Sequence, residues 1–262
     1  MTATEDFAVE LPGGGRMPLL GFGTWQLRGE QARRAVAWAL EAGYRHMDTA
    51  TMYRNEGEVG AAVAEAGLPR DQVFVTTKLP PEHADSSRRT LERSLETLGL
   101  DQVDLWLVHW PPRGRARPDT WEAFVRAQQD GLTRDIGVSN YSLEQVDELT
   151  KATGVTPAVD QVEWGPTLYE KRFHDGCHVR GVALEGYSPF RSGDLSHPVL
   201  TRIAERHGVT PAQVVVRWHL QHGVTVIPRS SRRDRIRSNA DVAVLDLDDD
   251  EMASVDAMSS VA

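Results

Sequence analysis

The sequence has almost no cysteine: Cys177 is the single one among 262 residues. One cysteine excludes a disulfide bond within the chain and any metal or redox site that needs several thiols. An excess of basic charge is also absent, because 38 acidic residues outnumber 29 basic ones and give a formal charge of -9. An acidic chain without a basic run is a poor partner for a phosphate backbone, so we expect no nucleic-acid partner.

Long apolar runs are missing as well. No segment approaches the roughly 18 apolar residues of a membrane-spanning helix, so we expect no membrane partner. The segment from Met1 to Pro12 carries three acidic residues and lacks the apolar core of a secretory signal, which favours a cytoplasmic protein. No linker rich in proline, glycine or serine divides the chain. We therefore expect a single domain over residues 1–262 and a monomer.

The sequence does contain a regular alternation of two patterns. Eight short apolar runs rich in β-branched residues are separated by stretches with helical spacing. The runs lie at Leu19–Phe22, Arg45–Thr49, Val73–Lys78, Val103–His109, Asp135–Ser139, Ala158–Glu163, Gly181–Tyr187 and Val224–Pro228. Several are apolar throughout, as in parallel strands that are covered on both faces. Eight strand–helix units in about 250 residues predict an α/β fold, a TIM (β/α)8 barrel, with a doubly wound open sheet as the alternative.

Further segments predict additions to this barrel. Phe7–Met17, with three glycines in its middle, predicts an N-terminal β-hairpin. The interval between the seventh and eighth runs holds two helical stretches, His197–His207 and Thr210–His222, so one extra helix is expected there. Asp248–Met258 predicts a surface helix near the C-terminus.

Polar residues lie at or just after the carboxyl ends of the runs, where TIM barrels carry their chemistry. They are Asp48, Lys78, His109, Ser139, Asn140, Gln161, Tyr187, Ser188, Arg229 and Ser230. Each has an ordinary explanation by itself, such as a helix cap at Asp48, a core histidine at His109 or a satisfied buried amide at Gln161. Together they surround one rim, and that joint pattern indicates a functional site.

Four residues of this rim suggest a reaction. Tyr53 follows Asp48 on the next loop, and its phenol, with an ordinary pKa of about 10, is a poor proton donor near neutrality. The ammonium of Lys78 could lower that pKa, and Asp48 could hold Lys78 in place and charged. His109 could orient the oxygen of a substrate. This set suits proton donation to an oxygen that is becoming an alkoxide, which implies carbonyl reduction by a hydride from elsewhere.

Several motifs occur together and in a fixed order. They are GFGTW, GYRHMDTATMYRNEGEVG, VTTKL, DLWLVHWP, IGVSN, QVEW, GYSPF and IPRSSRRDRIRSN, spread over about four fifths of the chain. With these motifs the chain resembles the aldo-keto reductases, and among them the bacterial members similar to diketogluconate reductase. The resemblance implies a TIM barrel, an NADPH cofactor and an oxidoreductase of the carbonyl reductase type.

The same resemblance implies roles for individual residues. Asp48, Tyr53, Lys78 and His109 would form a catalytic tetrad with Tyr53 as the general acid. The cofactor would be bound by Ser139, Asn140 and Gln161 at the nicotinamide carboxamide, by Tyr187 stacked on the nicotinamide ring, by Ser188 at the pyrophosphate, by Arg229, Ser230 and Arg235 at the adenosine 2′-phosphate, and by Asn239 near the adenine.

The residues themselves agree with this cofactor. No GxGxxG turn follows a predicted strand, so a Rossmann site is not indicated. Arg229 and Arg235 form a cationic pair suited to a phosphate monoester, which favours NADPH over NADH. The alternative is that Arg232, Arg233 and Arg235, with Arg237, form a solvated basic face.

Departures from the family pattern concern the walls of the pocket. Gly165 stands where a histidine is common, and the chain ends soon after Met258, without most of a C-terminal loop. The connection Pro189–Pro198 is also short. We therefore expect an open substrate pocket, lined by Trp25 and Trp110.

The sequence leaves three functions to compare. The first is NADPH-dependent reduction of small aldehydes, α-dicarbonyls or keto-sugars. The second is a nicotinamide-binding regulatory or sensor protein with little turnover, which does not require an intact tetrad. The third is a Schiff-base aldolase using Lys78, which Asp48 disfavours by keeping the amine protonated. No metal is expected, because no HxH pair ends a strand.

Overall fold

The computed structural model describes residues 7–259 and contains an eight-stranded parallel barrel. The barrel strands are β3 (Gly21–Gly23), β4 (His46–Asp48), β5 (Phe74–Leu79), β6 (Val103–Val108), β7 (Thr133–Ser139), β8 (Val159–Glu163), β9 (Ala183–Tyr187) and β10 (Thr225–Val226). They pair in chain order, and a parallel bridge between Leu20 and Val226 joins the first strand to the last. The predicted TIM barrel is confirmed, and the open-sheet alternative is wrong.

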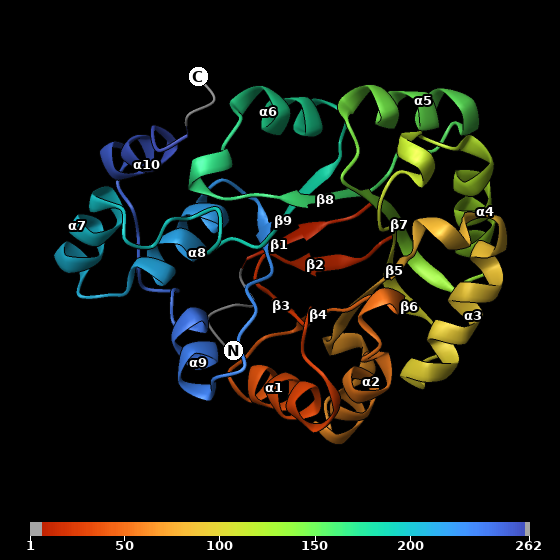
Figure 1. Cartoon of the computed structure of the whole chain (residues 1–262), viewed down its shortest axis with the longest axis horizontal. Helices are drawn as coiled ribbons and strands as arrows, with labels where there is room; N and C mark the ends of the chain where they lie inside the picture. Colours follow the sequence, from red (N-terminus) through yellow and green to blue (C-terminus); the bar gives the residue numbers. More distant parts are fainter. Residues whose placement is uncertain (1–6, 260–262) are drawn as a thin grey trace.

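Helices surround the strands, as Figure 1 shows. They are α1 (Gly29–Glu41), α2 (Glu56–Glu65), α3 (Ser87–Leu98), α4 (Pro118–Gln129), α5 (Leu143–Thr153), α6 (Lys171–Val179), α7 (Pro198–His207), α8 (Pro211–Gln221), α9 (Arg233–Ala240) and α10 (Asp249–Asp256). Each long helix buries one apolar stripe, as Ala32, Val36 and Leu40 do on α1. The expected pair of helices between the seventh and eighth barrel strands is present as α7 and α8.

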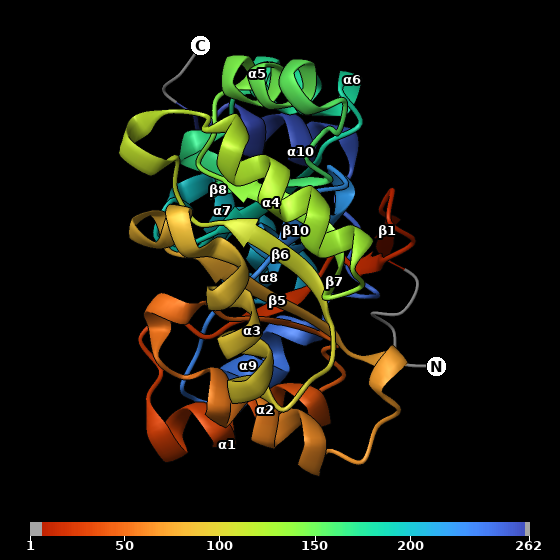
Figure 2. The same ribbon diagram turned by 90° about the vertical axis from the view of Figure 1, so that its right-hand side faces the viewer.

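The predicted N-terminal hairpin is formed by β1 (Ala8–Glu10) and β2 (Arg16–Pro18), and it lies over one end of the barrel (Figures 1 and 2). Its turn is held by Asp135 on β7, which accepts hydrogen bonds from the backbone N–H groups of Gly13 at 2.6 Å and Gly15 at 2.9 Å. A Cβ at Gly13 would lie only 2.6 Å from the Asp135 carboxylate, so this close approach requires glycine.

The other end of the barrel carries the polar side chains. Alternate residues of each strand point into the barrel, so the strand register sets which side chains meet. Asp48 pairs in register with Thr76, two residues before Lys78, and Ser139 pairs with Gln161. The inward-facing residues at the strand ends therefore converge on one rim.

Candidate active site

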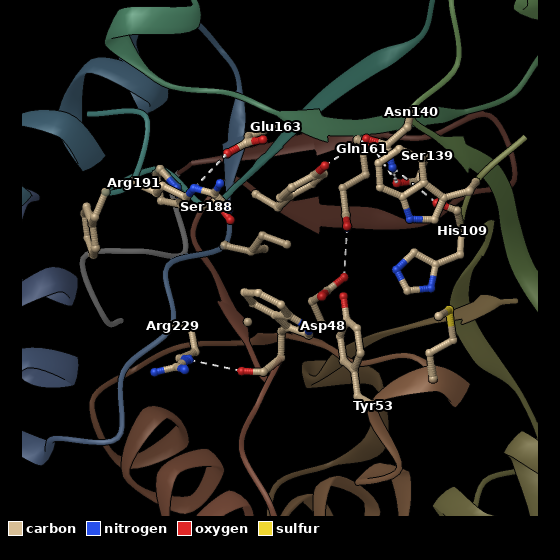
Figure 3. Close-up of a pocket in the computed structure, with 18 of the residues that line it drawn as sticks. Asp48, Tyr53, His109, Ser139, Asn140, Gln161, Glu163, Ser188, Arg191 and Arg229 are labelled. Carbon is tan, nitrogen blue, oxygen red and sulfur yellow. Dashed lines mark hydrogen bonds and ion pairs between the residues drawn. The ribbon is translucent and has the colours of Figure 1, made fainter. Parts of the chain in front are cut away.

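A cavity of about 580 Å³ opens at the carboxyl ends of the strands. Figure 3 shows Asp48, Tyr53 and His109 on one side of it, with Arg191 and Arg229 on the opposite side. Most of the rim residues expected from the sequence line this cavity: Trp25, Asp48, Tyr53, His109, Trp110, Ser139, Asn140, Gln161, Tyr187, Ser188 and Arg229. Lys78 lies beneath it, completely buried.

The floor of the cavity is an ion pair between Asp48 and Lys78. The Lys78 ammonium donates to both carboxylate oxygens, at 2.7 and 2.6 Å, and to the backbone oxygen of Thr49 at 2.9 Å. Burial lowers the pKa of Lys78, but Asp48 and Tyr53 outweigh this effect, so the net pKa is raised. The amine is therefore an ammonium and not a nucleophile, which disfavours the aldolase alternative.

Tyr53 is brought to this ion pair by a short helical turn. The turn η1 (Thr51–Tyr53) ends at Arg54, which has a positive φ of 53°. The Tyr53 hydroxyl lies 3.4 Å from the Lys78 ammonium, and its ring centroid lies 4.9 Å from the same nitrogen. The catalytic set expected from the sequence is thus in one place, with the phenol beside the ammonium.

Buried polar residues that the sequence reasoning missed hold this turn in position. The Asn55 amide donates to the backbone oxygens of Thr24 at 2.9 Å and Leu27 at 3.0 Å, and it accepts from the Thr49 hydroxyl at 2.8 Å. Asn55 is completely buried. Asn55 directly follows Tyr53 and Arg54 in the motif TATMYRNE, and this position could have indicated its role.

The ionisation of Tyr53 differs from the expectation. Burial raises the pKa of the phenol, the charge of Lys78 lowers it, and the charge of Asp48 raises it again, with a net rise. The expected net lowering by Lys78 is therefore wrong, because desolvation of the phenolate is the larger effect. The phenol is protonated at neutral pH, which is the state that a proton donor needs.

His109 packs edge-on against Tyr53, with ring centroids 5.6 Å apart. Burial, together with the charge of Lys78, lowers the pKa of the imidazole to about 3. Its ring is therefore neutral, so it can position an oxygen atom by hydrogen bonding but does not compete as an acid near neutral pH.

The residues expected to hold a carboxamide form hydrogen bonds with one another and with their neighbours. The Asn140 amide donates to the Ser139 hydroxyl at 2.9 Å, and the Tyr187 hydroxyl donates to the Asn140 oxygen at 2.9 Å. Gln161 donates to Asp48 at 2.9 Å, a contact that the sequence did not predict (Figure 3). This bond ties the amide group to the ion pair on the floor.

The residues expected at the adenosine end of the cofactor fall into two groups. Arg229 lines the cavity and donates to the backbone oxygen of Trp25 at 3.0 Å and to the Gln26 side chain at 2.8 Å. Ser230, Arg235 and Asn239 lie nearby in the sequence but do not line this cavity. Of the residues proposed as a solvated basic face, Arg232 pairs with Asp234 at 2.7 Å and Arg233 pairs with Glu41 at 2.8 Å.

Apolar side chains are exposed at the entrance of the cavity. Trp25, Met52 and Trp110 are each about half exposed and line the cavity. The structure also explains the glycine that follows Trp164: a Cβ at Gly165 would lie 2.5 Å from the Ser192 hydroxyl. The loop after β9 packs so closely here that a larger residue would displace it.

Comparisons with known proteins agree with this geometry. The model of the Aldo/keto reductase family matches residues 19–260. An aldo-keto reductase of Mycolicibacterium smegmatis is 43% identical over 94% of this chain and 91% of that protein. The glyoxal reductase of Bacillus subtilis is 40% identical over 98% of this chain and 94% of that protein.

A solved structure is similar over nearly the whole fold. The crystal structure of an aldo/keto reductase from Brucella melitensis has a TM-score of 0.92 and 37% identity, covering 96% of this chain and 97% of that one. No helix within residues 7–259 is both long and apolar enough to cross a membrane.

Proposed function

The chain belongs to the aldo/keto reductase family, and we propose that it reduces aldehyde and ketone carbonyls to alcohols with NADPH. The substrates would be small aldehydes, α-dicarbonyls or keto-sugars. The observation that carries this proposal is the Lys78 ammonium, held between the Asp48 carboxylate and the Tyr53 hydroxyl at the floor of an open cavity. The relative named glyoxal reductase supports an α-dicarbonyl substrate.

Tyr53 is the proton donor in this proposal. Its raised pKa keeps the phenol protonated, so a proton is available for the oxygen of a carbonyl. Transfer of that proton leaves a phenolate 3.4 Å from the Lys78 ammonium, which stabilises the negative charge. Asp48 keeps the ammonium charged and fixes it in place through two hydrogen bonds.

His109 orients the substrate. Its imidazole is neutral and lies beside the Tyr53 ring, so its N–H group can donate a hydrogen bond to the carbonyl oxygen. At neutral pH this ring does not act as the acid. The half-exposed rings of Trp25 and Trp110 supply an apolar surface for the rest of the substrate.

The donor groups along the cavity fit a nicotinamide dinucleotide. The Tyr187 hydroxyl donates to the Asn140 amide oxygen at 2.9 Å, and all three side chains of Asn140, Gln161 and Tyr187 line the cavity. The guanidinium groups of Arg191 and Arg229 lie across the cavity from Asn140 and Gln161 (Figure 3). Amides suit a carboxamide, an aromatic face suits a flat ring, and guanidinium groups suit phosphates. The cavity therefore offers matching groups for the nicotinamide and for phosphates of the cofactor.

We assign the cofactor contacts accordingly. Ser139, Asn140 and Gln161 would bind the carboxamide, Tyr187 the nicotinamide face, Ser188 the pyrophosphate, Arg229, Ser230 and Arg235 the 2′-phosphate, and Asn239 the adenine. When bound, NADPH supplies the hydride that adds to the carbonyl carbon, while Tyr53 supplies the proton that completes the alcohol.

The test is a fluorescence titration of the protein with NADPH and NADH, followed by a panel of carbonyl compounds. We expect NADPH to bind more tightly, because Arg229 and Arg235 offer cationic partners for its extra phosphate. We expect NADPH oxidation with methylglyoxal or a similar α-dicarbonyl. Bound NADPH without oxidation by any member of the panel would contradict the proposal and favour a regulatory protein.

A further inference from the structure

A second buried carboxylate, Glu185, lies in the interior of the barrel near the Asp48–Lys78 ion pair. Glu185 is on β9, in register with Gln161 on β8 and with Thr225 on β10, and it is completely buried. Tyr187, two residues further along the same strand, faces the cavity. Glu185 therefore sits one layer below the cavity, on the inner face of the barrel.

The surroundings of Glu185 do not fully satisfy its carboxyl group. One oxygen lies 3.7 Å from the His46 ring nitrogen, which is 3.0 Å from the Thr76 hydroxyl. Neither oxygen has a partner at ordinary hydrogen-bond distance among residues 7–259. A buried carboxylate with so few donors is costly in its ionised form, since nothing replaces the lost water.

The charged and titratable groups around Glu185 come from three elements: His46 and Asp48 on β4, Lys78 on β5 and Tyr53 on η1. Burial raises the pKa of Glu185 to about 8, and the charge of Asp48 acts in the same direction, while Gln161 and Lys78 oppose it. Burial lowers the pKa of His46 to about 3, so that ring stays neutral. Near neutral pH the Glu185 carboxyl group is therefore mainly protonated.

A buried polar chain begins at Gln161, which is in register with Glu185 on the neighbouring strand, and leads to the tyrosine. We define the chain as Gln161, Asp48 and Lys78. Gln161 donates to Asp48 at 2.9 Å, Asp48 accepts from Lys78 at 2.6 Å, and the Lys78 ammonium lies 3.4 Å from the Tyr53 hydroxyl. The charge of an ionised Glu185 raises the pKa of both Lys78 and Tyr53. Glu185 therefore acts on the proton donor electrostatically, across the same buried space that this chain occupies.

We propose that Glu185 is a positioning residue for the reduction, one that acts on Lys78 and the Tyr53 hydroxyl through its charge in this buried space. The inference rests on the proposed function. In the reduction, the Tyr53 O–H bond breaks, its proton passes to the substrate oxygen, and a phenolate remains beside Lys78. A neutral Glu185 leaves the ammonium free to stabilise that phenolate. An ionised Glu185 adds a second negative charge to the same buried space and disfavours it.

The variant Glu185→Gln tests this role, because it keeps the shape and removes the ionisation. In the wild type, kcat/KM for carbonyl reduction should fall by about a factor of ten as pH rises through the range near 8, which corresponds to one pKa unit of charge interaction. In Glu185→Gln this fall should be absent. Glu185→Leu, which also removes the charge, should give the same profile if the glutamine variant folds poorly.

A second readout does not depend on turnover. The ionisation of Tyr53 can be followed by the difference absorbance of the phenolate, with Tyr53→Phe as the blank. Because an ionised Glu185 disfavours the phenolate, Glu185→Gln should lower the pH of Tyr53 ionisation by roughly one unit. If the protein reduces no carbonyl compound, the proposed function fails while this titration still decides the role of Glu185.

Asp135→Asn is the matched control, because it neutralises another completely buried carboxyl group, at the hairpin end of the barrel. It should lower stability but leave both the pH profile and the phenol titration unchanged. The inference is overturned if Glu185→Gln keeps the fall near pH 8 and the wild-type Tyr53 ionisation. It is also overturned if Asp135→Asn shifts them equally, since the effect would then be a general loss of packing.

Discussion

The two ends of the barrel each bury a carboxylate, but they satisfy it in different ways. At the hairpin end, Asp135 accepts hydrogen bonds from the backbone of Gly13 and Gly15. At the cavity end, Asp48 is bound by the Lys78 ammonium and the Gln161 amide. The first carboxylate is bound by neutral groups of the backbone, and the second by a fixed ammonium beside a phenol.

The side chains around the two carboxylates also differ between the two ends of the barrel. Near the hairpin, the barrel interior is filled by buried apolar side chains, namely Met17, Phe74, Leu105, Leu107 and Val159. At the other end, the interior opens into a cavity with a tyrosine, a histidine and amide groups. One end of the fold thus supplies stability, and the other keeps a charged group where a substrate can approach it.

The largest effect should come from Lys78→Met, which removes the cation from the cavity end. We expect kcat to fall by about a thousandfold or more, because the phenolate left by proton transfer loses its stabilising charge. The unpaired Asp48 should also lower the free energy of unfolding by about 3–5 kcal/mol. Steady-state kinetics and urea unfolding measure the two effects.

A double variant separates these two effects. Asp48→Asn with Lys78→Met removes the uncompensated buried charge, so it should recover much of the stability lost by Lys78→Met alone. It should not recover the activity. Recovery of turnover in the double variant would show that the ammonium acts only as a structural partner.

A smaller effect, restricted to stability, is expected for Asp135→Ala at the hairpin end. The N–H groups of Gly13 and Gly15 lose their acceptor, which should cost about 1–3 kcal/mol in the free energy of unfolding. Because the cavity lies at the opposite end of the strands, kcat/KM should be unchanged. A large loss of activity in the folded variant would contradict the claim that the hairpin end contributes to stability and not to catalysis.

Most of the fold was predictable because strands and helices have different apolar periods. The ends of the strands were less predictable, since other contacts compete for the backbone. The eighth strand was predicted over Val224–Pro228 but is formed only by Thr225–Val226. The N–H of Val224 donates to the backbone oxygen of His219, so Val224 does not extend the pairing. Ile227 and Pro228 still contact the neighbouring strands, because the Ile227 N–H donates to Gly186 and the Pro228 oxygen accepts from Gly23, but these bonds lie outside the regular ladder.

The first strand shows the same competition. It was predicted over Leu19–Phe22 and is observed over Gly21–Gly23. The N–H of Leu19 donates to the backbone oxygen of Phe7 beside the hairpin, while its own oxygen accepts from Val226 of β10. Leu19 therefore links the hairpin to the barrel and lies just before the regular ladder of β3. Tertiary contacts of this kind are not visible in a local pattern.

The positions of the site residues were predictable from their place at strand ends, but their electrostatics were not. The pKa of Tyr53 depends on how deeply the phenol is buried, and a sequence gives no burial depth. Glu185 was missed because it lies inside a predicted strand, where a single polar residue has no distinctive spacing. Its importance depends on its proximity to Gln161 and His46, which only the closed barrel creates.

The central claim is that the Tyr53 phenol, beside the Lys78 ammonium, donates the proton in a carbonyl reduction. The most direct measurement compares NADPH oxidation and NADPH affinity in the wild type and in Tyr53→Phe, which removes only the hydroxyl. The account predicts an unchanged affinity and a loss of turnover of about a hundredfold or more. Equal turnover in the two proteins would contradict it.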